Sequence, residues 1–364
     1  MSILLFIIIL AVLIIAHEFG HFIAAKKAGV RVDEFGVGFP PRLLKKQIGE
    51  TTYSLNAFPV GGFVKIFGEN PDEESINGKD SSRSFIHKPK FVQAWIISAG
   101  IIFNLLLAWL LISLGFMMGM PFSAQDEKYG ERVTDVSLTI TQVLPDSPAA
   151  KAGIKSGDRI VALYGNGDAL EDPTIESTKE FIGAHSDITF AYLRNKEIKA
   201  VEVLPIDGVV SGQKGIGISM DTAGTLKLPV YEAVYVGSLA TVNMTESTAL
   251  GLLHFFKNLF TGNAAFSEVA GPVGIVGIVS DASEQGLVNL ILLTALISIN
   301  LAIINLLPFP ALDGGRLLFI LIEAIKGSPI RPVVANTANG IGFILLILLM
   351  VVVTYHDIVR LLHS

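Results

Sequence analysis

The chain begins with an apolar run that is long enough to cross a membrane. Residues 1–25 contain no Lys or Arg, and 51% of the whole chain is hydrophobic while only 16% is charged. A helix of about 20 mostly apolar residues spans the hydrocarbon core of a bilayer. Further apolar runs lie at residues 91–120, 287–308 and 337–355. The sequence therefore predicts a polytopic α-helical membrane protein with about four transmembrane helices.

Basic residues predict how these helices are oriented. Residues 26–90 hold eleven Lys and Arg against eight acids, and the positive-inside rule assigns such a loop to the cytoplasm. The loop at residues 309–336 is then cytoplasmic as well, because two helices separate it from the first loop. The N-terminus and the tail at residues 356–364 are predicted to lie outside the cytoplasm.

Three ionisable residues in the first apolar run indicate a functional site. In AHEFGHF, His17 and His21 are four residues apart, so a helix places them on one face. Two imidazoles with this spacing can bind one zinc ion, and Glu18 would lie beside the open coordination position as a base. The alternative is a chance HExxH with packed histidines. The cost of burying ionisable groups at membrane depth argues against it.

A third zinc ligand is predicted after the third apolar run. The chain has no cysteine, which excludes disulfides, thiol nucleophiles and cysteine-bound metals, so any metal must be held by His and carboxylate side chains. In NLLPFPALDGG, Pro308 and Pro310 must break the helix, and Asp313 follows on the same predicted side of the membrane as His17. The alternative role for Asp313 is to cap the next helix. Asn305 has the donors and the acceptor to hold a substrate carbonyl.

The cytoplasmic loop at residues 26–90 is predicted to contain β-structure. TTYSLNAFPVGGFVKIFGE alternates apolar and polar residues, and Gly61 and Gly62 would permit a tight turn. A hairpin beside the first helix could offer its edge to an extended peptide. The alternative is a plain surface hairpin. In the second apolar run, Asn104 is predicted to make a helix-to-helix hydrogen bond.

The segment after the second apolar run changes character. Residues 122–222 are polar and carry short alternating strands, which predicts one inserted β-rich domain. Its stretch LPDSPAAKAGIKSGDRIVALYG resembles the PDZ domains of bacterial membrane and periplasmic proteases, which implies a groove for a peptide terminus or strand. Alternatively, the domain only occludes the site. Residues 227–286 are predicted to form amphipathic, juxtamembrane helices.

The chain as a whole resembles the site-2 protease family of intramembrane zinc metalloproteases, and in particular the bacterial regulators of sigma-E type with a single PDZ domain. The resemblance is carried by HEFGH, GVGF, FPVGGFVKIFGE, the PDZ-like insert and NLLPFPALDGG. One departure is Ile101, which replaces the proline of the family's AGPxxN pattern, so the family's kink in the second helix is not carried over.

The resemblance implies a role for each candidate site residue. Zinc would be bound by His17, His21 and Asp313, with Glu18 as the general base. The substrate would be contacted by Asn305, Pro308, Pro310 and a membrane-re-entrant β-element around Gly61 and Gly62.

The implied activity is hydrolysis of single-span membrane proteins, such as anti-sigma factors and remnant signal peptides, after another protease has trimmed them. The implied location is the bacterial cytoplasmic membrane, with the PDZ domain outside and the active site toward the cytoplasm. The alternative is a catalytically inactive membrane scaffold that presents a PDZ domain. No nucleic-acid partner is expected, because the chain has a net charge of -6 and no basic cluster with interleaved aromatic residues.

Overall fold

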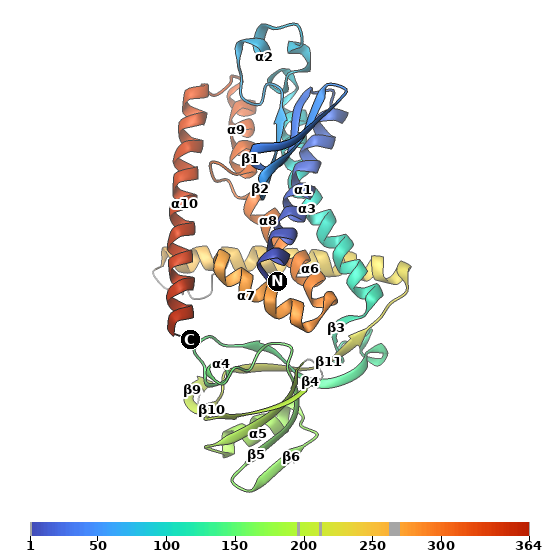
Figure 1. Cartoon of the computed structure of the whole chain (residues 1–364), viewed down its shortest axis with the longest axis vertical. Coiled ribbons are helices and arrows are strands. Elements are labelled where there is room, and N and C mark those ends of the chain that lie inside the picture. Colours follow the sequence, from blue (N-terminus) through green and yellow to red (C-terminus); the bar gives the residue numbers. More distant parts are fainter. Residues whose placement is uncertain (1, 195–196, 211–212, 262–269, 364) are drawn as a thin grey trace. The chain divides into compact units, whose positions relative to one another are not determined.

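The computed structural model of the chain describes residues 2–194, 197–210, 213–261 and 270–363 (Figure 1). The chain divides into two compact units. The first contains residues 1–113, 234–280 and 291–359, and the second contains residues 114–233, 281–290 and 360–364.

Helices that are long and apolar enough to cross a membrane number four among the described residues, which confirms the predicted count. They are α1 (Ser2–Lys27), α3 (Lys90–Met118), α8 (Leu287–Leu306) and α10 (Pro332–His363). The last helix begins earlier than residue 337, because Pro332 suits the first position of a helix, where no backbone N–H is needed.

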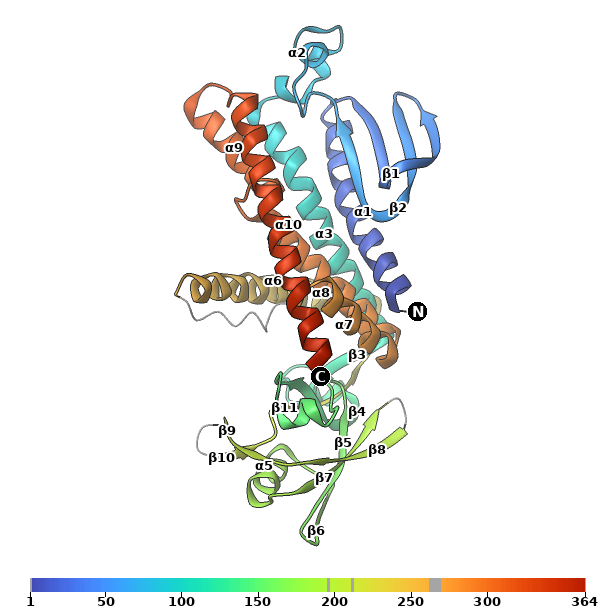
Figure 2. The ribbon, with the colours of Figure 1, turned by 60° about the vertical axis from the view of Figure 1, so that its left-hand side comes forward.

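Helices α1 and α3 pack closely along one another (Figure 2). A Cβ atom on Gly20 would collide with the carbonyl group of Ala99, so the two backbones approach one another at this glycine. Around this contact lies a buried core that includes Phe22, Ile96 and Ile97. The two helices therefore form a fixed pair, and α1 carries the histidine motif.

The region predicted as a cytoplasmic loop at residues 309–336 contains a further helix, α9 (Asp313–Lys326). It ends at Gly327, whose φ of 73° is a left-handed conformation that favours glycine. Ile320 of α9 is buried in the same core as Phe22 of α1. The helix that the sequence analysis expected after Asp313 is therefore present, and it packs in the same core as α1.

The predicted hairpin is a sheet of β1 (Val32–Ile48) and β2 (Thr51–Ile66) in which the two strands pair in more than one register. Val37 is aligned with both Leu55 and Gly62, so the first part of β1 lies between two parts of β2. The expectation of a tight turn at Gly61 and Gly62 was wrong, since both lie within β2. The connection between the strands is instead at residues 49–50.

Close packing explains why the glycines lie inside the strand. A Cβ atom on Gly62 would be 3.1 Å from Ile14 Cγ2 and 3.3 Å from Glu18 Cγ, both on α1. Gly61 has a φ of 119°, which L side chains rarely adopt. Gly62 thus lets β2 lie directly against α1, while Gly61 lies against Phe39 of β1. The connection to α3 contains the short elements α2 (Glu73–Asn77), η1 (Ser81–Arg83) and η2 (Phe85–His87).

The second unit is built on a seven-stranded sheet in the order β3-β11-β4-β5-β7-β8, with β6 beside β5. The bounds are β3 (Met120–Ser123), η3 (Gly130–Arg132), β4 (Thr134–Val143), α4 (Pro148–Lys151), β5 (Arg159–Gly165), β6 (Asp168–Glu171), α5 (Ile175–Ala184), β7 (Ile188–Arg194), β8 (Glu197–Val203), β9 (Ile206–Val210), β10 (Gln213–Gly215) and β11 (Ile218–Leu226). Its core includes Ile140, Leu163 and Phe190. The β-rich insert is thus present, and it extends a few residues beyond 122–222 at both ends.

The segment predicted to be juxtamembrane forms α6 (Val230–Phe260) and α7 (Pro272–Gln285). Helix α6 runs across the direction of α1 and α3 (Figures 1 and 2), and Trp109 of α3 donates a hydrogen bond of 3.0 Å to Ser238 Oγ of α6. Asp357 of α10 accepts hydrogen bonds from the backbone N–H groups of Gly271 and Gly274 and so caps the start of α7.

Candidate metal centre

Three potential metal ligands from opposite ends of the chain converge in the first unit. His17 Nε2 lies 3.1 Å from Asp313 Oδ2, His21 Nε2 lies 3.3 Å from the same oxygen, and the two Nε2 atoms are 3.2 Å apart. Both histidines are buried. Among the described residues this is the group of three or more His, Cys, Asp or Glu side chains that could hold a metal ion.

The triangle of these atoms fits a tetrahedral zinc ion. Ligands at about 2.0–2.1 Å in tetrahedral geometry are separated by about 3.3–3.4 Å, close to the three observed separations. Asp313 Oδ2 is buried and has no conventional hydrogen-bond partner in the described chain, although such atoms are normally satisfied. Two imidazoles and a carboxylate are also the donor set of a catalytic zinc site that keeps one open position.

Local structure explains how Asp313 reaches the histidines. Prolines follow the end of α8 and prevent the helix from continuing. Leu312 is the N-cap of α9, and Asp313 is its first residue. A Cβ atom on Gly314 or Gly315 would collide with backbone carbonyl groups of residues 306–309, so only glycine permits this tight entry into α9. Burial raises the pKa of Asp313, but the neighbouring His17 and His21 outweigh it and lower the pKa to about 2. The carboxylate is therefore ionised, as a ligand must be.

Helix α3 supplies the groups behind the two imidazoles. His21 Nδ1 lies 2.9 Å from the carbonyl oxygen of Ile96, and His17 Nδ1 lies 3.2 Å from Asn104 Nδ2. Between them, a Cβ atom on Gly100 would collide with His21 Nε2. Gly100 was not among the predicted site residues, and Asn104 was expected only to make a helix-to-helix hydrogen bond. The four-residue spacing of 96, 100 and 104 was the one sequence signal that could have indicated a shared face of α3.

Glu18 is half-buried beside the triangle but is not part of it. Its Cγ atom lies against Gly62 of β2, and it follows His17 by one residue on α1. One turn after Asp313, Arg316 of α9 forms an ion pair with Glu69. Glu18 is thus free of metal ligation and lies between the candidate metal centre and the strand β2.

The other predicted site residues lie just before Asp313. Asn305 is half-buried in the last turn of α8, and Pro308 and Pro310 lie in the segment that joins α8 to α9. This segment is held by α10, because Asn339 Oδ1 accepts a hydrogen bond of 3.1 Å from the backbone N–H of Ala311. Ala311 has a φ of 75°, a strained conformation for a non-glycine residue.

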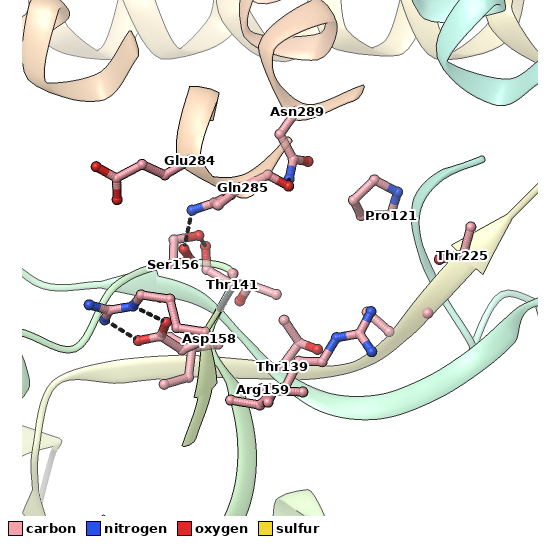
Figure 3. A pocket seen from close by; sticks show the side chains of 16 residues that line it. Pro121, Thr139, Thr141, Ser156, Asp158, Arg159, Thr225, Glu284, Gln285 and Asn289 are labelled. Carbon is pink, nitrogen blue, oxygen red and sulfur yellow. Dashed lines mark hydrogen bonds and ion pairs between the residues drawn. The ribbon is translucent and has the colours of Figure 1, made fainter. Parts of the chain in front are cut away.

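A large cavity of 780 Å³ lies in the second unit and contains none of the three ligands (Figure 3). Two charged residues of its lining, Asp158 and Arg194, are paired with one another. Asp158 receives two hydrogen bonds of 2.6 Å from Arg194, and this contact raises the pKa of the arginine. Gln285 closes one side by donating a hydrogen bond to the backbone oxygen of Ser156. Polar and apolar residues both line the pocket.

The chain is similar to known proteases along nearly its whole length. The profile described as peptidase family M50 matches residues 5–349. The regulator of sigma-W protease RasP of Bacillus subtilis is 30% identical over 438 aligned positions, covering 99% of both chains. The zinc metalloprotease RasP of Shouchella clausii is 30% identical over 431 positions with 99% of both chains covered. A Clostridium acetobutylicum protein, named as an inferred zinc metalloprotease, is 34% identical over 359 residues, or 98% of this chain and 97% of its own.

Proposed function

The chain belongs to peptidase family M50, the site-2 proteases, and is a zinc metalloprotease, and on this premise we propose that it hydrolyses single-span membrane proteins at the centre formed by His17, His21 and Asp313. The observation that carries the proposal is the triangle of ligand atoms, at 3.1–3.3 Å, reached from a transmembrane helix. Helix α1 places this centre within the first span.

Glu18 is the general base in this proposal. A zinc ion bound to the three ligands supplies a Lewis acid for the scissile carbonyl and acidifies the attacking water. Glu18 lies about 100° around the helix from His17, so its carboxylate flanks the centre without binding the metal. It takes the proton from the water and passes it to the leaving amine. Gly62 lies against Glu18 and leaves room beside it.

The sheet of β1 and β2 presents the substrate as a strand. A carbonyl in a helix is already hydrogen-bonded and shielded, so a transmembrane substrate must be extended before hydrolysis. Residues 62–66 of β2 pair with the first part of β1 and lie next to α1. An extended peptide added along this part of β2 would pass Glu18. Asn305, with Pro308 and Pro310, precedes Asp313 and would hold the peptide from the other side.

The substrate class follows from the relatives and from the inserted domain. RasP of Bacillus subtilis is named as a regulator of sigma-W protease, so an anti-sigma factor is a substrate of the right class, and a remnant signal peptide has the same single-span form. The insert resembles a PDZ domain, and its groove would bind a peptide terminus or strand. We place the insert and both termini outside the bacterial cytoplasmic membrane, with the active site toward the cytoplasm, because the basic loop follows α1.

Metal removal tests this function directly. Incubation of the detergent-purified chain with a strong chelator is expected to abolish cleavage of a model single-span substrate, and stoichiometric zinc is expected to restore it. The reason is that the two imidazoles and the carboxylate cannot polarise a carbonyl without the ion. Cleavage is followed on gels and zinc per chain by elemental analysis. Full activity in a zinc-free chain would rule the proposal out, and a chain that binds no zinc would favour the inactive scaffold.

Removal of the inserted domain is expected to relax the requirement for trimmed substrates. Ser123 of β3 is paired with Ala223 of β11, so residues 126–219 can be replaced by a short Gly-Ser turn that closes this strand pair. Cleavage of a substrate with an intact outer domain, relative to its trimmed form, is expected to rise about tenfold, which corresponds to about 1.4 kcal/mol of lost discrimination. The trimmed substrate is the control for the fold of the membrane unit. An unchanged ratio would show that the insert does not select substrates.

A further inference from the structure

One face of α3 is matched to the two histidines of α1. Ile96, Gly100 and Asn104 follow one another at intervals of four residues and so lie on one side of the helix. His21 is opposite Ile96, and His17 is opposite Asn104. Gly100, between them, leaves the space that the imidazole rings occupy. Each imidazole therefore has one group of α3 behind it, on the side away from Asp313.

The partner of His21 fixes its tautomer. A backbone carbonyl oxygen can only accept a hydrogen bond, so the 2.9 Å contact with Ile96 requires that His21 Nδ1 carries the proton. In the neutral imidazole the other nitrogen, Nε2, is then unprotonated. That atom is the one directed at Asp313 and His17. His21 is thus oriented as a metal ligand by the backbone of α3.

The same logic applies to His17 and defines what Asn104 must do. His17 Nε2 faces Asp313, so a ligating His17 must carry its proton on Nδ1, which makes Nδ1 a donor. The nearest atom of Asn104 is the amide nitrogen Nδ2, also a donor, at 3.2 Å. The amide oxygen Oδ1 is buried without a partner, although the side chain is 0% exposed. A half-turn of the amide exchanges the two atoms and lets Oδ1 accept the Nδ1 proton of His17.

We propose that Asn104 is a positioning residue for the metal centre: its amide oxygen accepts the Nδ1 proton of His17 and holds the tautomer whose Nε2 binds zinc. The inference rests on the proposed zinc site. Such partners behind metal-bound histidines orient the ring and raise its basicity as a ligand. The hydrogen bond that joins α3 to α8 here does not use the side-chain amide of Asn104. Ser298 of α8 donates it, over 2.7 Å, to the backbone oxygen of Asn104, so the amide remains available to His17.

Three variants of the full-length chain separate the acceptor role from packing. Asn104→Asp keeps an acceptor of similar shape, whereas Asn104→Leu keeps the volume but has no acceptor. Ser298→Ala removes only the hydrogen bond from Ser298 of α8 to the backbone oxygen of Asn104. Zinc affinity is measured by competition with a chromophoric chelator in detergent. The visible absorption of the cobalt-loaded chain reports the ligand geometry.

The Leu variant is expected to bind zinc about 10–100-fold more weakly and to show an altered cobalt spectrum. The Asp and Ser298→Ala variants are expected to match the wild type in both measurements. Wild-type affinity and spectrum in the Leu variant would overturn the proposal, as would equal weakening in the Leu and Asp variants or in Ser298→Ala. A wild-type chain that binds no zinc would instead refute the zinc site itself, so the two failures are distinguishable.

Discussion

Replacing Glu18 by Gln should abolish peptide hydrolysis while leaving zinc bound. Glu18 is not one of the three converging ligands, so its loss does not open the metal centre. The amide has nearly the same shape but cannot accept the proton of the attacking water. General-base catalysis contributes about 10²–10⁴-fold to rate, and a loss of this size is expected in single-turnover cleavage of a model single-span substrate.

The matched control is Glu176→Gln, which removes a carboxylate from the exposed first turn of α5. This variant is expected to keep both its zinc and its activity. Zinc per chain in Glu18→Gln is measured on the same preparation as cleavage. Cleavage by Glu18→Gln at the wild-type rate would show that another group is the base, whereas loss of zinc in this variant would make Glu18 a ligand.

Gly100→Ala is expected to destroy the metal centre with a single added methyl group. The new Cβ atom would collide with His21 Nε2, the proposed ligand atom, and would also lie 2.7 Å from His17 Cε1. To relieve this collision, either the imidazoles must rotate or α3 must move away from α1. Either change separates the three atoms that would bind the metal. Because the ligand atoms are displaced, zinc affinity is expected to fall by about 100-fold or more, beyond the usual cost of losing an outer partner.

The control for helix propensity and membrane insertion is Gly340→Ala in α10, where a Cβ atom would meet nothing within 4 Å. It is expected to leave zinc affinity unchanged and to stabilise its helix slightly, because alanine is the better helix former. Chelator competition measures both variants. Stoichiometric zinc of wild-type affinity in Gly100→Ala would contradict the described packing of α3 against the histidines.

The convergence of the three proposed ligands could be expected from the sequence because helix geometry is local. Four-residue spacing puts His17 and His21 on one face whatever surrounds α1. For Asp313 the expectation needed only its place after the prolines and its predicted side of the membrane. The contacts of Gly100 and Asn104 with the histidines could not be predicted in this way, because their four-residue spacing indicates a contact face only when the opposite helix is known.

The sheet of β1 and β2 shows where local sequence patterns were not sufficient. Alternating residues in 51–66 indicated a strand correctly, yet the turn was expected at Gly61 and Gly62 because glycine suits turns and close packing equally well. In the structure Gly62 packs against α1, and Gly61 packs against Phe39 of β1. Helix α9 was expected only as the helix that Asp313 would cap if it were not a ligand, and the structure makes Leu312 the N-cap and Asp313 the first residue of the helix. At the glycine pair a tertiary contact decided between two local alternatives.

The assembly of the metal centre has a consequence for synthesis. His17 leaves the ribosome near the start of translation, whereas Asp313 follows only after the inserted domain and α8 have been made. Until then a nascent chain has two imidazoles but no third ligand, and zinc is held weakly. The proposed centre can therefore form only after the inserted domain and α8 have been synthesised, so its assembly depends on the folding of both.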